Sequence, residues 1–222
     1  MKVNRREVII GAGATSLANL ATPFAWAQPA PKRGGTLNSV LWPEPPGLVT
    51  GLWLNAPTLL PATKIFEGLI TFDFKLNPQP MLAESWEIAP DGLTYTFKLR
   101  KGVTWHDGKP FTADDVVFSC GEFLTEVHPR SRPKFRENPA NANPIGTGPF
   151  KFKEWQRGQF IHLVRNDSYW QPGKPYLDEI YYRLIPDSAG RALALESGQV
   201  DLATQNDIEL IDVQRLKALP QL

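Results

Sequence analysis

A strand–helix–strand pattern near the end of the chain places the strongest constraint on the fold. The segment 177–185, LDEIYYRLI, alternates as a strand does. The segment 187–198 is typical of a helix that is capped by Asp187 and ends at Gly198, and 199–203, QVDLA, returns to strand composition. Two strands joined by a helix over so few residues form a right-handed crossover with parallel strands. The pattern therefore predicts a mixed α/β protein.

The first 27 residues have the pattern of a cleavable export signal. A basic start is followed by a moderately apolar run, and Ala25-Trp26-Ala27 supplies the small-residue cleavage pattern A-x-A. A membrane anchor is disfavoured, because the apolar run contains Pro23 and falls short of the ~20 strongly apolar residues that a span needs. We therefore expect export followed by cleavage after Ala27.

The export route and the charge of the mature chain narrow the range of functions. The Arg5-Arg6 pair is typical of a twin-arginine signal, but Asn4 and Val8 depart from its usual pattern, so twin-arginine and Sec export both stay open. Cleavage removes three basic residues and one acidic residue, which changes 24 basic and 23 acidic residues to 21 and 22. A nearly neutral chain has no electrostatic footprint for nucleic acid or an anionic membrane, so neither is expected as a partner.

The cysteine content fits a fold that depends on its apolar core. Cys120 is the only cysteine, so no intramolecular disulfide can form. Gln28, and not a cysteine, follows the predicted cleavage site, so a lipid anchor is not indicated. We expect a soluble periplasmic protein without direct membrane insertion after cleavage.

Several further strands are predicted by alternation and turn residues. Apolar residues alternate with polar ones over 93–100, which predicts a half-buried strand that opens at an Asp-Gly turn. Lys101-Gly102 then predicts a turn into a second strand over 103–105, which would complete an antiparallel hairpin. We also expect a strand over 36–42, a helix running into a strand over 62–73, and a hairpin around Arg157-Gly158.

The stretch 102–119, GVTWHDGKPFTADDVVFS, sets His106 among three carboxylates and raises the question of catalysis. Its composition favours structure instead. The residues 107–110 are turn residues, and Thr112 followed by Asp115 has the form of a capping box. Asp114 joins Asp115 in the first helical turn, where negative charge favours the helix dipole. Val116, Cys120 and Phe123 recur at helical spacing and are expected to form the buried face.

No constellation in the sequence supports catalysis, a metal site or a cofactor. The histidines 106, 128 and 162 fall in a turn, a loop and a strand, without H-x-x-x-H or C-x-x-C spacing. No G-x-S-x-G elbow occurs, and 146–148 leads into a strand, which argues against a phosphate loop. A secreted hydrolase stays a distant alternative, with His106 as its only starting point.

Four segments together resemble a known family of extracytoplasmic solute-binding proteins, the peptide/nickel class that serves ABC importers. They span most of residues 33–203 in family order: FEGL at 66–69, PMLAESWEIAPDGLTYTFKLRKGVTWHDGKPFTADDVVFS at 80–119, NPIGTGPFKFKEW at 143–155 with NDSYW at 166–170, and LDEIYYRLIPDSAGRALALESGQVD at 177–201. A string of this length is far more specific than any single short motif.

The resemblance implies an α/β fold like that of type II periplasmic binding proteins, with two lobes and a small domain inserted into the first lobe. By this likeness residues 28–62 and 143–205 belong to the first lobe, 63–142 to an incomplete inserted domain, and 206–222 to the start of a second lobe that is largely absent. The family normally carries a further stretch near residue 138. We therefore expect an internally deleted and truncated member.

The resemblance also implies a function, which is ligand capture in the periplasm for an ABC permease, without chemistry on the ligand. The expected ligand is a small peptide-like solute, and no cofactor is expected. The residues implied to contact it are Trp42 and Glu44, just after the first strand, with Trp53 behind them. Loop packing and a solvated acid are the competing interpretation of these three residues. With one lobe missing, we expect affinity below that of the family.

An alternative of a different class is an exported protein-interaction module without small-ligand capture. Strands whose partners lie in absent segments would expose edges and apolar surface that another protein could bind. A defined complex in solution would favour this alternative.

Overall fold

The computed structural model describes residues 31–50, 53–119, 143–204 and 207–219. All its named elements lie in one compact unit, Lys32–Leu222. The predicted export signal, Cys120, Phe123 and the position 138 lie outside the described residues. In chain order the elements are β1 (Thr36–Leu41), α1 (Ala56–Ile65), β2 (Ile70–Phe72), β3 (Pro78–Pro80), β4 (Ala83–Ile88), β5 (Tyr95–Leu99), α2 (Ala113–Val117), β6 (Phe150–Gln156), β7 (Phe160–Arg165), β8 (Glu179–Leu184), α5 (Ser188–Glu196) and α6 (Leu210–Lys217).

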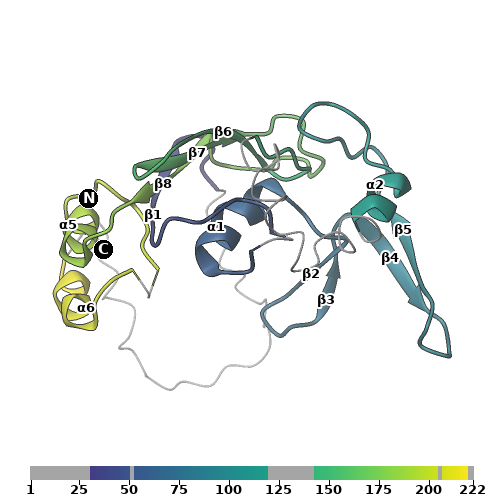
Figure 1. Cartoon of the computed structure of the whole chain (residues 1–222), viewed down its shortest axis with the longest axis horizontal. Helices are drawn as coiled ribbons and strands as arrows, with labels where there is room; N and C mark the ends of the chain where they lie inside the picture. Colours follow the sequence, from purple (N-terminus) through teal and green to yellow (C-terminus); the bar gives the residue numbers. More distant parts are fainter. Residues whose placement is uncertain (1–30, 51–52, 120–142, 205–206, 220–222) are drawn as a thin grey trace, which may run out of the picture. The chain divides into compact units, whose positions relative to one another are not determined.

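The main sheet has four strands in the order β1-β8-β7-β6 (Figure 1). β1 pairs with β8 in parallel, whereas β6, β7 and β8 pair antiparallel in succession. The β6–β7 turn uses Gly158 at φ 72°, a left-handed conformation that glycine adopts without steric cost. The predicted strands over 36–42 and 177–185 and the hairpin around Arg157-Gly158 are confirmed.

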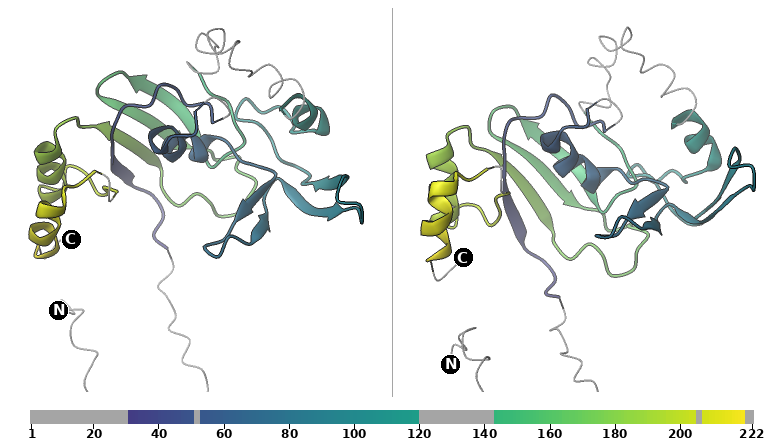
Figure 2. Two further views of the ribbon diagram at one scale, coloured as in Figure 1. Left: turned by 60° about the horizontal axis from the view of Figure 1, so that its bottom comes forward. Right: turned by 90° about the horizontal axis from the view of Figure 1, so that it is seen from below.

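The parallel direction predicted for the crossover after β8 is confirmed, but its second strand is not formed as predicted. α5 begins at the N-cap Asp187, and Gly198 follows it at φ 74°. The returning segment makes only one parallel bridge, between Leu202 and Ser39, so β1 lies between it and β8. Beside this bridge the Asp201 carboxylate accepts the Asn38 N–H at 2.7 Å. Figure 2 shows α5 and α6 beside this end of the sheet.

The core lies between α1 and one face of the main sheet. The Tyr182 hydroxyl donates to the Leu60 carbonyl of α1 at 3.0 Å, which ties the helix to β8. Each aliphatic or aromatic side chain buried here contributes about 1.5–3 kcal/mol relative to an exposed one. The buried residues of this cluster are Leu41, Leu48, Ile65, Phe150, Ile161, Leu163, Ile180, Tyr182 and Leu184.

The segment between α1 and α2 forms two separate two-stranded sheets, β2–β3 and β4–β5. The strand predicted over 93–100 is present as β5, but its predicted partner is wrong, because β5 pairs with β4. The Asp91-Gly92 turn closes this hairpin, with Ala89 N–H donating to the Thr94 carbonyl at 2.9 Å. Residues 103–105 pair instead with 109–111, through a bridge from Thr104 to Pro110 and a hydrogen bond on each side of it. Local alternation identified the strand but carried no information on which strand it pairs with.

The stretch 105–119 folds as turn and helix. The Lys109 N–H donates to the Asp107 carboxylate at 3.1 Å, and the Thr112 N–H donates to Asp115 at 2.7 Å. The predicted capping box and the acidic first turn are therefore confirmed. Val116 is half-buried, and no residue of α2 itself is fully buried. Within the described ranges, no helix has the length and apolar character needed to cross a membrane.

Candidate functional site

The three residues expected to contact a ligand lie in the connection between β1 and α1. Trp42 is 39% exposed directly after β1, and its peptide bond to Pro43 is cis. Trp53 is half-buried and its ring packs on Gly47, where an added Cβ would lie 2.2 Å from the ring. A larger residue at position 47 would therefore require the Trp53 ring to shift.

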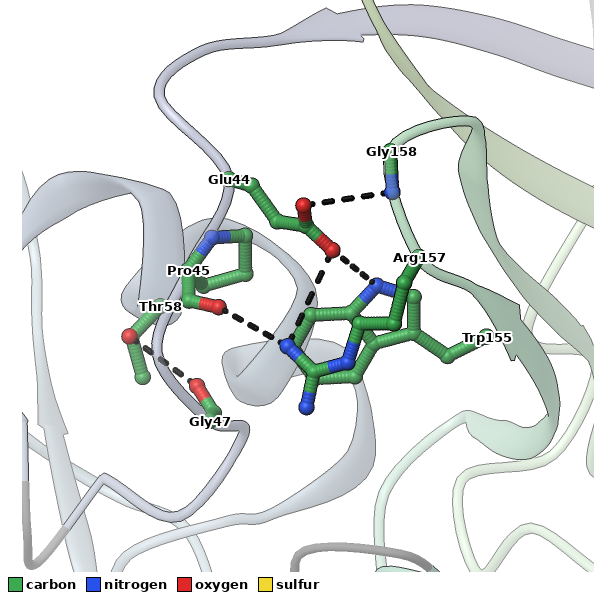
Figure 3. A network of polar contacts seen from close by, with 7 residues as sticks. All are labelled: Glu44, Pro45, Gly47, Thr58, Trp155, Arg157 and Gly158. Carbon is green, nitrogen blue, oxygen red and sulfur yellow. Dashed lines mark hydrogen bonds and ion pairs between the residues drawn. The ribbon is translucent and has the colours of Figure 1, made fainter.

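Both carboxylate oxygens of Glu44 are bound by the β6–β7 hairpin, one by the end of β6 and one by the turn (Figure 3). Its Oε1 accepts from the Trp155 indole N–H at 2.9 Å and lies 3.7 Å from Arg157 Nη1. Its Oε2 accepts from the Gly158 backbone N–H at 3.2 Å. Arg157 lies 3.5 Å above the Trp155 ring and donates to the Pro45 carbonyl at 3.5 Å. The β1–α1 connection is thus fastened to the main sheet through one acidic side chain.

A cavity of about 970 Å³ opens beside the same connection. Val49 and Thr50 contribute to its wall, whereas Trp42, Glu44 and Trp53 do not line it. Apolar and aromatic side chains alternate with a few charged ones, which is the usual composition of a small-molecule pocket. Its other lining residues include Phe66, Glu67, Leu69, Leu82, Trp105, Asp107, Lys109, Phe111, Asp114, Phe118 and Thr147.

Glu67 connects the cavity wall to the main-sheet segment. Its carboxylate accepts from Thr147 Oγ1 at 3.0 Å, from the Tyr169 hydroxyl at 2.6 Å and from the Trp170 indole N–H at 2.9 Å. Burial, together with the bond to Glu67, raises the pKa of Tyr169 above its ordinary value. Sequence reasoning did not single out Glu67. Its only signal was its place in the FEGL motif, which gives no indication of distant partners.

His106 also holds the loop 146–148, through its backbone. Its Nδ1 accepts from the Gly146 N–H at 3.3 Å, which leaves the Nε2 proton to donate to the Gly148 carbonyl at 3.0 Å. Burial lowers the pKa of His106, and the nearby Lys151 ammonium adds to this effect. This arrangement requires a neutral imidazole and leaves no free ring nitrogen for acid/base chemistry.

The glycines of this loop are required by close packing. An added Cβ would lie 1.9 Å from the Ile65 carbonyl oxygen at Gly146, and 2.5 Å from the Lys64 oxygen at Gly148. The loop therefore approaches the end of α1 backbone to backbone, and it leads into β6, not into a helix. The prediction that it is not a phosphate loop agrees with this geometry.

The other described histidine, His162, lies in β7 beneath Tyr181, with the rings stacked at 4.0 Å. Burial lowers the pKa of His162 despite the nearby carboxylates, Glu179 at 3.6 Å and Glu154 at 3.9 Å. His128 lies outside the described residues. Among the residues that the structure does describe, no group of three or more His, Cys, Asp or Glu side chains could hold a metal ion.

Comparison with known proteins gives one family and a consistent set of relatives. The model of the bacterial extracellular solute-binding proteins, family 5 (middle part), matches residues 77–135 and 122–221. The oligopeptide-binding protein AppA of Bacillus subtilis is 35% identical over 188 residues, which cover 62% of this chain and 34% of AppA. Heme-binding protein A of Haemophilus influenzae is 29% identical over 246 residues, which cover 80% of this chain and 44% of that protein.

Solved structures agree with these matches. The structure of B. subtilis AppA in complex with a nonapeptide has a TM-score of 0.75 at 28% identity, and covers 86% of this chain and 47% of that one. The periplasmic binding protein DppA of Helicobacter pylori, in complex with the peptide STSA, has a TM-score of 0.74 at 27% identity, and covers 85% and 50%. The chain thus spans between about a third and a half of the length of these relatives.

Proposed function

The chain belongs to the bacterial extracellular solute-binding proteins of family 5, and from this membership we propose that it captures peptides or related solutes for an ABC importer. The observation that carries the proposal is the family match, which extends from residue 77 to residue 221. The likeness to two solved peptide complexes supports it. The expected α/β fold of the type II periplasmic binding proteins is confirmed by these structural relatives.

The proposed domain assignment follows the sheets. β1 and β6–β8 share the main sheet, which supports placing residues 28–62 and 143–205 together in a first lobe. β2–β5 form separate small sheets, which supports an inserted domain over 63–142. The loop 146–148 connects the two parts, because His106 bonds to its backbone and Glu67 to its Thr147 side chain. We propose no function for residues 206–222 beyond their place in the fold.

We propose that this chain supplies one wall of a ligand cleft. The connection between β1 and α1, with Trp42 and Trp53, is the proposed contact surface, and the adjacent cavity extends it. The alignment with B. subtilis AppA is 188 positions long, but it covers only 62% of the 222 residues of this chain, or about 138. About 50 aligned positions of AppA therefore have no counterpart in this chain. Because affinity in such proteins depends on burying the ligand between two lobes, we expect weak binding by this chain alone.

The proposed location is the periplasm, supported by the export pattern of the first 27 residues. We also propose that the chain carries out no reaction on its ligand. The relatives named above are binding proteins, and both His106 ring nitrogens are engaged by backbone groups.

Isothermal titration calorimetry with an equimolar pool of alanine di-, tri- and pentapeptides tests the proposed function. We expect weak saturable binding that Trp42→Ala reduces by about fivefold, since an aromatic contact contributes on the order of 1 kcal/mol. Leu76→Ala is the matched control, because Leu76 is 78% exposed and lies in the turn between β2 and β3. Equal affinity of the wild type and Trp42→Ala would contradict the assignment of the contact surface.

One observation favours the alternative of a protein-interaction module. The cross-strand pairs Trp86 with Phe97 and Ile88 with Tyr95 give β4–β5 one apolar face, and Ile88 and Tyr95 are 53% and 56% exposed. Size-exclusion chromatography with light scattering separates the two functions. A monomer that binds the peptides supports solute capture, and a defined complex that fails to bind them supports the alternative.

A further inference from the structure

The segment 42–47 after β1 has few means of holding its own position. Three of its residues, Pro43, Pro45 and Pro46, have no backbone N–H and so cannot donate a hydrogen bond. The segment is held in place through backbone carbonyls and one side chain. The Gly47 carbonyl accepts from Thr58 Oγ1 at 3.0 Å, and the Pro45 carbonyl accepts from Arg157 at 3.5 Å.

The Glu44 side chain supplies the strongest of these attachments. Both carboxylate oxygens point at the β6–β7 hairpin, where they accept from Trp155 at the end of β6 at 2.9 Å and from Gly158 in the turn at 3.2 Å (Figure 3). Hydrogen bonds to an ionised acceptor are about twice as strong as those between neutral groups. The side chain is 28% exposed, so water competes only in part with the protein donors.

The segment that Glu44 holds also carries or contacts the two aromatic residues of the proposed contact surface, Trp42 and Trp53. Trp42 precedes Glu44 by two residues, and Pro43 fixes the backbone between them. On the other side, Pro45 and Pro46 lead stiffly to Gly47, against which the Trp53 ring packs. We therefore expect a movement of Glu44 to displace both tryptophans.

We propose that Glu44 is a positioning residue, which fastens the segment 42–47 to the β6–β7 turn and so sets the orientation of Trp42 and Trp53. In this role its carboxylate contacts Trp155 and Gly158, and not the solute. The proposal rests on the proposed function for its effect on ligand capture, but the attachment itself is a property of the free protein.

The first arm of the test therefore uses the 222-residue chain without ligand. In ¹H–¹⁵N spectra, Glu44→Ala is expected to shift the indole N–H signals of Trp42, Trp53 and Trp155. Trp155→Phe removes the indole donor but keeps an aromatic ring, and it should shift the signals of Trp42 and Trp53 in the same direction. Glu154→Ala is the matched control, because Glu154 lies beside Trp155 in β6 but contacts His162. Unmoved signals of Trp42 and Trp53 in Glu44→Ala would overturn the proposal.

The second arm is a double-mutant cycle with the alanine peptide pool. Glu44→Ala and Trp155→Phe are each expected to weaken binding by about fivefold. The double variant should bind no more weakly than Glu44→Ala, because the bond that Trp155→Phe removes is already lost in Glu44→Ala. Effects that add would show that Glu44 acts on binding independently of Trp155, and would overturn the proposal. Absence of binding by the wild type would count against the proposed function, and the ligand-free spectra would still decide the role of Glu44.

Discussion

The His106 side chain keeps its contacts only while it is neutral. Its Nδ1 must accept from Gly146 and its Nε2 must donate to Gly148, and a second ring proton would remove the acceptor. The sequence identified His106 correctly as part of a turn, because Asp107, Gly108 and Pro110 are turn residues. It could not show the partner loop, which lies 40 residues further along the chain.

This contact predicts a pH dependence of stability. The pKa of His106 is lowered in the folded chain, so the unfolded chain binds a proton that the folded chain does not. The stabilisation is fully present above the ordinary histidine pKa of 6.5 and is lost as the pH falls below it. Urea unfolding from about pH 8 to about pH 5 should show this loss. His106→Ala should flatten the profile, whereas an unchanged slope in that variant would contradict the account. The pKa of His162 is lowered as well, so this residue contributes to the same pH dependence. His162→Phe is the comparison variant that measures the contribution of His162 separately.

Glu67 gives a second prediction at the scale of a residue. Glu67→Ala leaves the donors of Thr147, Tyr169 and Trp170 without their acceptor and should lower the free energy of unfolding by about 2–4 kcal/mol. Glu67→Gln keeps one acceptor oxygen and should lose less. Glu87→Ala, an exposed glutamate of β4, is the control in thermal unfolding. Equal stability of the Glu67 and Glu87 variants would show that the three bonds contribute nothing net.

At the scale of elements, local signals identified strands and helices, but pairing depended on contacts that sequence spacing does not reveal. β5 was predicted from alternation and is present, but it pairs with β4, which precedes it, and not with 103–105. Asp187 and Gly198 marked the ends of α5 correctly, because caps act within a few residues. The strand predicted after α5 is reduced to one bridge, and the Asp201 side chain bonds to the Asn38 N–H beside it.

The cap of α5 is open to a direct test. Asp187 accepts from the Gly190 N–H, so Asp187→Ala should lower the free energy of unfolding by about 1 kcal/mol. Asp187→Ser should retain most of it, because serine also caps helices well. Asp167→Ala, at an exposed position outside any helix, is the control. A loss equal to that of the control would mean that the cap does not stabilise α5.

At the scale of the whole molecule, the family could be identified from the sequence, whereas the cavity could not. The long string of matching segments indicated the family and the type of fold. The cavity is formed by Val49, Glu67, Trp105 and Thr147, which are far apart along the chain and meet only after folding. Of the three residues implied to contact a ligand, Trp42 and Trp53 share one segment with an exposed or half-buried ring, and Glu44 is engaged by the main sheet. Their contact with a solute stays a prediction.

Hydrogen–deuterium exchange of the 222-residue chain, with and without the alanine peptide pool, tests the central claim most directly because it locates the ligand. We predict slower exchange at Val49 and Thr50 and along 66–69, where the β1–α1 connection meets the cavity wall. Exchange in β4–β5 should be unchanged. Protection confined to β4–β5, or no protection anywhere at saturating peptide, would contradict the assignment of this chain as the wall of a solute-binding cleft.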